Sequence, residues 1–178
     1  MKKILAIGAS TSRQSINRQF ASWAASRVDG AEVTTLDLND FAMPLFSVDL
    51  EAEGGIPDEA KEFFGAIRSH DGVVISLAEH NGSYSAAFKN IFDWTSRLEQ
   101  KLWSGKPMLL LSTSPGARGG TGVHGAAASS FPHLGAEIAG GFSMPSFYDN
   151  FSEGEGITDT VLASKFSVEL EKFVAALG

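Results

Sequence analysis

The sequence contains no cysteine among its 178 residues. That absence excludes disulfides, cysteine-ligated zinc, iron–sulfur clusters and a thiol nucleophile. It also lacks any apolar run near the ~20 residues of a membrane span. The short apolar stretch at the N-terminus is followed at once by polar residues, unlike a secretory signal. We therefore expect a cytoplasmic protein with no membrane partner.

Positive charge is also scarce. Fourteen Lys and Arg stand against 21 Asp and Glu, which gives a net charge of −7. A surface of this sign repels nucleic acid as a whole, so no nucleic-acid partner is expected. The hydrophobic share of 43% is typical of a folded globule. The length, with no repeat or linker, predicts a single domain over residues 1–178.

Apolar segments of two kinds alternate along the chain. Five short runs predict β-strands, at residues 2–8, 32–38, 72–78, 108–112 and 136–142. Apolar residues at helical spacing predict helices between and after them, at residues 16–28, 56–67, 88–98 and 161–177. Repeated strand–helix alternation predicts an α/β fold, with a parallel sheet covered by helices on both faces.

In such a fold, ligands bind beyond the carboxyl ends of the strands. Three loops are expected there, at residues 8–17, 78–84 and 112–120. Two longer connections, at residues 39–55 and 143–156, exceed the usual loop length and are candidates to line a site or an interface.

The first of the three loops is rich in hydrogen-bond donors. It carries the hydroxyls of Ser10, Thr11, Ser12 and Ser15, and the guanidinium of Arg13, at the start of a predicted helix. Hydroxyls, a helix N-terminus and a positive charge together can hold a phosphate dianion. The alternative is that Ser15 only caps the helix. A cap accounts for one hydroxyl of the four, so the loop favours phosphate binding.

The other two loops are less specific by themselves. Asn81-Gly82 in the second is also the sequence of an ordinary tight turn. The third, residues 112–120, consists of small residues that let backbone approach a ligand, and it is equally consistent with a flexible connection. Both alternatives remain open from the residues alone.

Several other patterns carry little weight. Gly120 to Gly125 matches G-x-G-x-x-G, but no acidic residue follows about 20 positions later, so we expect a loose loop leading into a helix. No G-x-S-x-G elbow is present. The histidines show no metal-ligand spacing, and no metal is expected; they are His70, His80, His124 and His133.

Taken together and in order, the three loops resemble the motifs of the NADPH-dependent FMN reductase family. Residues 9–17 (ASTSRQSIN) are similar to the family's Gly-Ser-x-Arg-x-x-Ser-x-Asn, and residues 78–83 (AEHNGS) to its Pro-Glu-Tyr-Asn-x-Ser. Residues 88–94 (FKNIFDW), 104–107 (SGKP) and 114–116 (SPG) also match. The sequence departs from the pattern at Ala9, Ser12, Ala78 and His80. The resemblance covers residues 2–120 and thins toward the C-terminus.

The resemblance implies a flavodoxin-like three-layer sandwich with strand order 2-1-3-4-5. It also implies FMN as cofactor, NADPH or NADH as hydride donor, and a small-molecule electron acceptor such as a flavin, quinone, azo compound or metal oxyanion. Because the flavin carries the chemistry, no catalytic side chain is expected.

The resemblance further suggests which residues bind FMN. By this resemblance, the first loop binds the phosphate, with Arg13 nearby. The isoalloxazine ring is expected between the second and third loops. The implied residues are Ser10, Ser12, Arg13, Ser15, Ile16, Asn17, Glu79, His80, Asn81, Gly82, Ser83, Ser112, Ser114 and Gly116.

A homodimer or homotetramer is also implied, with each flavin near a subunit boundary. Trp94, Phe41 and Phe46 are candidates for that interface, and core packing is the equal alternative for Trp94.

A second function class remains open, which is a flavodoxin-type electron carrier that binds FMN and docks on a protein partner. A relative that has lost flavin and serves as a scaffold is a third. Arg13 and the turn leading into Lys89 and Asn90 favour the reductase.

Overall fold

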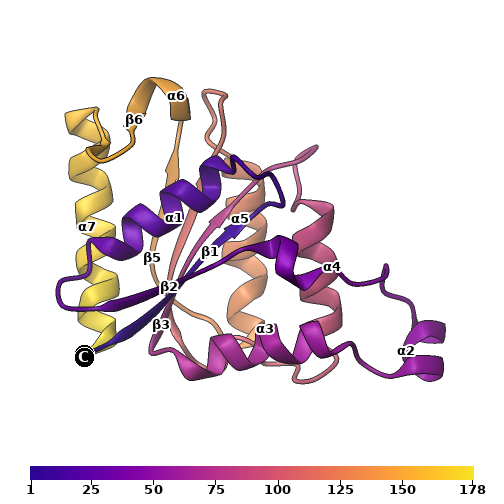
Figure 1. Cartoon of the computed structure of the whole chain (residues 1–178). Helices are drawn as coiled ribbons and strands as arrows, with labels where there is room; N and C mark the ends of the chain where they lie inside the picture. The colour runs from indigo at the N-terminus through magenta and orange to yellow at the C-terminus, as the bar shows by residue number, and fades with distance from the viewer.

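The computed structural model describes all 178 residues. Its centre is a five-stranded sheet, parallel throughout, with strand order β2-β1-β3-β4-β5 (Figure 1). The strands are β1 Lys3–Ala9, β2 Glu32–Leu36, β3 Gly72–Leu77, β4 Pro107–Thr113 and β5 Glu137–Met144. The expected α/β fold, its strand order and all five strands are confirmed, and no strand end differs from the prediction by more than two residues.

Helices cover both faces of the sheet (Figure 1). α1 (Ile16–Ser26) and α7 (Thr160–Leu177) lie on one face, whereas α3 (Asp58–Ser69), α4 (Ala86–Thr95) and α5 (Thr121–Ser130) lie on the other. The remaining elements are short: the 3-10 helices η1 (Leu38–Phe41) and η2 (Phe131–Leu134), the helices α2 (Val48–Gly54) and α6 (Phe147–Asn150), and the antiparallel pair β6 (Phe151–Ser152) and β7 (Gly156–Ile157). No helix is both long and apolar enough to cross a membrane.

The two cores follow from the alternation of side chains along buried strands. Leu5 and Ile7 of β1 join the core under α3, α4 and α5, whereas Ile4 and Ala6 join the core under α1 and α7. Because both faces are covered, β1 and β3 are apolar at almost every position. The sheet is thereby a rigid base for the loops at its carboxyl edge.

The two long connections contain structure that the sequence did not predict. Residues 39–55 include part of η1 and all of α2, and α2 projects from the body of the protein (Figure 1, right). None of the residues of α2 is buried, so it has no apolar stripe by which periodicity would reveal it. Residues 143–156 include α6 and β6.

Two of the three aromatic residues considered for an interface lie in the core. Trp94 is 1% exposed, and its indole N–H donates to the Pro44 carbonyl at 2.8 Å. Phe41 is buried against Phe63, with ring centroids 5.4 Å apart. The interface assignment of Trp94 and Phe41 is therefore corrected to core packing, and only Phe46, which packs edge-on against Trp94, stays half-buried at the surface.

The G-x-G-x-x-G segment is also different from expectation. Gly120 caps α5 in the left-handed conformation, with φ 76°, and the residues after it form the first turns of that helix. The segment is a helix start rather than a loose loop.

Candidate functional site

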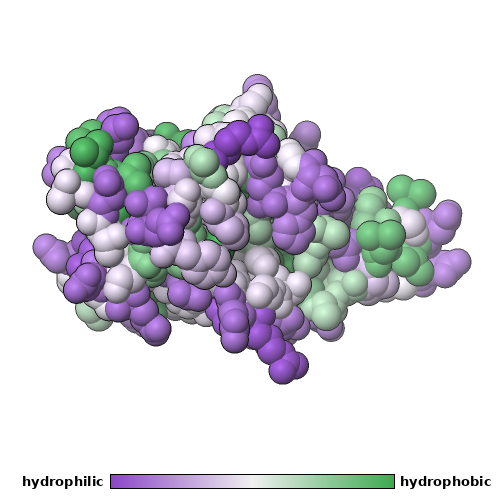
Figure 2. Space-filling view, turned by 90° about the horizontal axis from the view of Figure 1, so that it is seen from above, coloured by the Kyte–Doolittle hydropathy of each residue, from purple (hydrophilic) through white to green (hydrophobic).

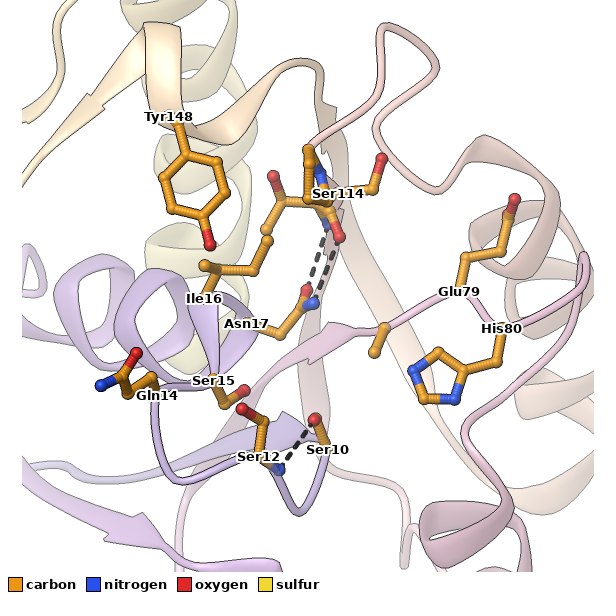
Figure 3. A pocket seen from close by; sticks show the side chains of 13 residues that line it. Ser10, Ser12, Gln14, Ser15, Ile16, Asn17, Glu79, His80, Ser114 and Tyr148 are labelled. Atoms are coloured by element: carbon orange, nitrogen blue, oxygen red, sulfur yellow. Dashed lines mark hydrogen bonds between the residues drawn. The ribbon is translucent and has the colours of Figure 1, made fainter.

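The three loops meet in one pocket of about 190 Å³ at the carboxyl ends of β1, β3 and β4 (Figure 3). Its lining comprises Ser10, Ser12, Gln14, Ser15, Ile16, Asn17, Ala78, Glu79, His80, Thr113, Ser114, Pro115 and Tyr148. Sites that enclose a whole drug-sized ligand hold about 300–1,000 Å³. This pocket is therefore sized for one end of such a ligand.

The first loop brings unpaired donors to the floor of the pocket. Ser15 caps α1, since its Oγ accepts from the Arg18 N–H at 3.1 Å. The backbone N–H groups of Ile16 and Asn17, the first two residues of α1, make no hydrogen bond within the chain. The Ser12 N–H donates to Ser10 Oγ at 3.1 Å. Free N–H groups at a positive helix end, with hydroxyls beside them, form a binding site for an anion.

Arg13 lies outside this pocket. Its side chain is exposed, and its carbonyl accepts a hydrogen bond from Arg18 at 2.8 Å. Arg18 in turn forms an ion pair with Asp37 at 2.7 Å. No lysine or arginine lines the pocket, so neutral donors and the helix end supply its attraction for an anion.

Asn17 lies in the centre of the site and is 3% exposed. Its Nδ2 donates to the Thr113 carbonyl at 3.2 Å, and its Oδ1 accepts from the Thr113 N–H at 3.1 Å (Figure 3). The same Oδ1 accepts from the Ser76 hydroxyl at 2.7 Å. The side-chain amide thus joins α1 to β3 and β4. Asn17 positions the first loop against the third.

The second loop is a tight hairpin turn. The backbones of His80 and Ser83 exchange two hydrogen bonds, at 2.9 and 3.1 Å. Asn81 and Gly82 between them have φ values of 53° and 77°, the left-handed pair that an Asn-Gly turn of type I′ requires. His80 lines the pocket, whereas Asn81, Gly82 and Ser83 are exposed and lie outside it.

Glu79 directs its carboxylate toward α5 rather than toward the centre of the pocket (Figure 3). Its Oε2 accepts from the Val123 N–H at 2.8 Å in the first turn of that helix. A Cβ at Gly122 would lie 2.7 Å from the same oxygen, so the glycine makes room for the carboxylate. Negative charge at a helix N-terminus is stabilising, and this contact fixes the second loop to α5.

The third loop contributes partly different residues than expected. Ser112 is fully buried, with its Oγ 2.8 Å from both the Gly119 carbonyl and Ser143 Oγ. Its hydroxyl is used inside the protein and does not reach the pocket. Gly116 also lies outside the lining and accepts a hydrogen bond from the Ser146 N–H. Thr113, Ser114 and Pro115 carry the contribution of this loop.

Five lining residues were not predicted from the sequence as binding residues. Four of them lie in or beside the expected loops and follow from the same argument; they are Gln14, Ala78, Thr113 and Pro115. Tyr148 is different, because it comes from α6 in the long connection 143–156, which the sequence analysis expected to line a site or an interface without naming a residue. No group of three or more His, Asp or Glu side chains is placed to hold a metal ion.

Similarity to curated proteins agrees with this geometry. The chain is 37% identical over 123 residues to a quinone reductase of Pseudomonas putida, covering 68% of this chain and 65% of that protein. It is 40% identical over 78 residues to a quinone reductase of Escherichia coli K12, covering 44% and 42%. The matched regions thus span less than two thirds of the length of these relatives.

A solved structure is similar over nearly the whole fold. FerB from Paracoccus denitrificans, described as a flavoenzyme NAD(P)H:(acceptor) oxidoreductase, superimposes with a TM-score of 0.77 at 25% identity, covering 99% of this chain and 97% of that one. The family model for NADPH-dependent FMN reductase matches residues 2–149, which include all three loops and the lining residue Tyr148. The chain belongs to the NADPH-dependent FMN reductase family.

Proposed function

We propose that this protein binds FMN in the pocket at the N-terminus of α1 and uses NADPH or NADH to reduce a small electron acceptor. The observation that carries the proposal is the pair of unpaired N–H groups of Ile16 and Asn17, surrounded by serine hydroxyls. Quinones are the first acceptor class to test, because the similar curated proteins are named quinone reductases. Residues 1–178 would act as one FMN-binding domain.

The residues present fit the phosphate end of FMN. A phosphate dianion accepts many hydrogen bonds and is favoured at a helix N-terminus. Ser10, Ser12 and Ser15 would donate to it together with the N–H groups of Ile16 and Asn17. The pocket volume of about 190 Å³ suits this end of the molecule and leaves the larger ring system at its mouth.

The second and third loops would hold the ring. His80 and Ser114 both line the pocket in Figure 3, and their loops follow the neighbouring strands β3 and β4. Asn17 fixes the third loop through Thr113, and Glu79 fixes the second through α5. When bound, the flavin supplies the hydride and electron transfer between nicotinamide and acceptor. The protein would supply orientation and would exclude water.

An apolar surface supports assembly into a homodimer or homotetramer. Leu45 is 79% exposed, Val48 65% and Leu50 39%. All three lie on the projecting segment of residues 45–54, which contains α2 and is called the apolar arm below. They belong to the apolar cluster on the projecting part of the protein (Figure 2, right). Homodimers with two-fold symmetry are the commonest soluble oligomers. A cytoplasmic location is part of the same proposal, because metabolism supplies reduced nicotinamide nucleotides there.

The test begins with the binding of FMN and riboflavin to the purified protein. FMN is expected to bind more tightly, since riboflavin lacks the phosphate. NADPH added anaerobically should then bleach the flavin absorbance with no acceptor present. A panel of a benzoquinone, an azo dye, free flavin and chromate identifies the acceptor class.

Two outcomes would contradict the proposal. Equal affinity for riboflavin and FMN would show that this pocket does not bind the phosphate. A tightly bound FMN that neither NADPH nor NADH reduces would favour the electron-carrier function instead.

A further inference from the structure

Tyr148 is the one aromatic side chain in the pocket lining, and it lies outside all three loops. Its side chain is 72% exposed, although a tyrosine ring usually gains from burial. The other tyrosine of the chain, Tyr84, lies among the aromatic rings of the core, and its hydroxyl is 3.3 Å from Ser130 Oγ. The two tyrosines therefore have different environments.

The backbone that carries Tyr148 is held firmly to the third loop. The Ser146 N–H donates to the Gly116 carbonyl at 2.9 Å, and the Phe147 N–H donates to the Ser114 carbonyl at 3.0 Å. Ser146 has φ 46°, a left-handed conformation that is costly for a residue with a side chain. Asn150 Nδ2 donates to the Pro145 carbonyl at 2.9 Å. The hydrogen bonds maintain this strained turn beside the pocket.

Phe147 anchors the same turn to the core with its buried ring. It is 4% exposed, and its ring stacks on Phe151 with centroids 4.8 Å apart. The residue next to this buried anchor, Tyr148, is thereby kept at the pocket rim. A backbone that is already ordered adds no loop-ordering cost when its side chain binds a ligand.

The phenol of Tyr148 faces the start of α1 across the pocket. In Figure 3 the ring of Tyr148 extends down toward Ile16. Ser10, Ser12 and Ser15 lie lower in the same view, on the other side of Ile16. An anion on the free N–H groups of Ile16 and Asn17 would thus have donors beneath it and the phenol above it. No lysine or arginine lines the pocket to take that place.

We infer that the Tyr148 hydroxyl donates a hydrogen bond to the phosphate of bound FMN and makes the site selective for phosphorylated flavin over riboflavin. This inference rests on the proposed function. It adds α6 to the first loop as an element that recognises the phosphate. The phenol supplies a neutral donor where the pocket lacks a cationic one.

The experiment measures dissociation constants of FMN and riboflavin for the flavin-free protein by quenching of flavin fluorescence. The variants are Tyr148→Phe, Tyr148→Ala and the matched control Tyr84→Phe. Tyr148→Phe should weaken FMN about tenfold, as expected for loss of one hydrogen bond to a charged group, and change riboflavin less than twofold. Tyr84→Phe should change neither. Melting temperatures verify that the variants fold, which the exposure of Tyr148 favours.

Several results would overturn the inference. Unchanged FMN affinity in Tyr148→Phe would exclude the hydrogen bond. An equal loss for FMN and riboflavin would indicate a contact with the ring or ribityl chain instead. Unchanged FMN affinity with weaker binding of NADP⁺ would assign the phenol to the phosphate of the nicotinamide nucleotide. A wild-type protein that binds neither flavin would contradict the proposed function itself, which the wild-type titration reveals separately.

Discussion

Asn17 and Thr113 are joined by two hydrogen bonds inside the pocket wall, one from the asparagine amide to the threonine carbonyl at 3.2 Å and one from the threonine N–H back to the amide oxygen at 3.1 Å. The residues are 96 positions apart in the chain and are both buried. This pair fixes the start of α1 to the end of β4. The first and third loops therefore form one rigid wall.

Asn17→Ala should destabilise the fold. It leaves the buried Thr113 backbone and the Ser76 hydroxyl without partners, and each unpaired buried group costs about 1–3 kcal/mol. We expect the free energy of unfolding in urea to fall by about 2–4 kcal/mol. FMN affinity should fall as well, because the two loops are no longer held together. A loss of stability below about 0.5 kcal/mol would show that the pair is not structurally important.

Ser12 and Arg13 provide a matched test of the phosphate site. Ser12 lines the pocket, whereas the adjacent Arg13 side chain is exposed and lies outside it. Ser12→Ala should weaken FMN about tenfold, since hydrogen bonds to charged groups contribute about 1.5–3 kcal/mol. Arg13→Ala should weaken it less than threefold. Titration of both variants with FMN and riboflavin checks this, and a larger effect from Arg13 would mean that its side chain turns inward on binding.

Glu79 and Gly122 should be energetically coupled. In the wild type, Gly122→Ala would displace the Glu79 carboxylate from the Val123 N–H, because the added Cβ lies 2.7 Å from Oε2. In a Glu79→Ala background the same substitution meets no carboxylate, and it should stabilise α5 by less than about 1 kcal/mol, the glycine-to-alanine gain in a helix interior, because Gly122 lies in the first turn. A double-mutant cycle in urea measures the coupling. Additive effects would contradict the contact.

Stability should fall as the pH drops below about 6.5, the ordinary pKa of histidine. Burial lowers the pKa of His124 in the folded protein, although its hydrogen bond to the Leu110 carbonyl opposes that shift. Between the unfolded and the folded pKa, the unfolded chain binds a proton that the native protein does not, so protonation favours unfolding. At higher pH the ring is neutral in both states.

His124→Gln isolates this contribution. The variant can still donate to the Leu110 carbonyl but does not titrate. Urea unfolding at pH 7.5, 6.5 and 5.5 should show a smaller loss of stability for the variant than for the wild type. The carboxylate of Asp37, whose pKa is lowered by hydrogen bonds from Asn39 and by Arg18, affects stability only at more acidic pH. Parallel curves for the two proteins would contradict the role of His124.

The apolar arm should mediate assembly. Replacing Leu45 and Val48 with Glu adds charge to the two most exposed apolar side chains of the arm and touches no pocket residue. We expect light scattering to give a dimer or tetramer for the wild type and a smaller mass for the double variant. Its melting temperature should change little unless assembly itself stabilises the chain. A monomeric wild type with full activity would contradict the assembly proposal.

Local patterns in the sequence predicted the five strands and four of the helices, and they offered the tight turn at Asn81-Gly82 and the cap at Ser15 as alternatives, both of which the structure contains. Each of these depends on neighbours within a few positions, where periodicity and turn chemistry act. The same local patterns placed the three loops after strands, and parallel strands bring their carboxyl ends to one edge. The location of the pocket therefore followed from the sequence.

How each side chain in those loops is used depends on the tertiary structure. In the fold, the Arg13 side chain is exposed outside the pocket, and the Ser112 hydroxyl is buried in a hydrogen bond with Ser143. The Asn17 amide is hydrogen-bonded to Thr113. Tyr148, which follows β5 in the chain, lies at the rim of the pocket. These outcomes depend on partners that are distant in sequence. Such partners are brought into contact by strand pairing and core packing, and no local pattern records which polar group will find another within the fold.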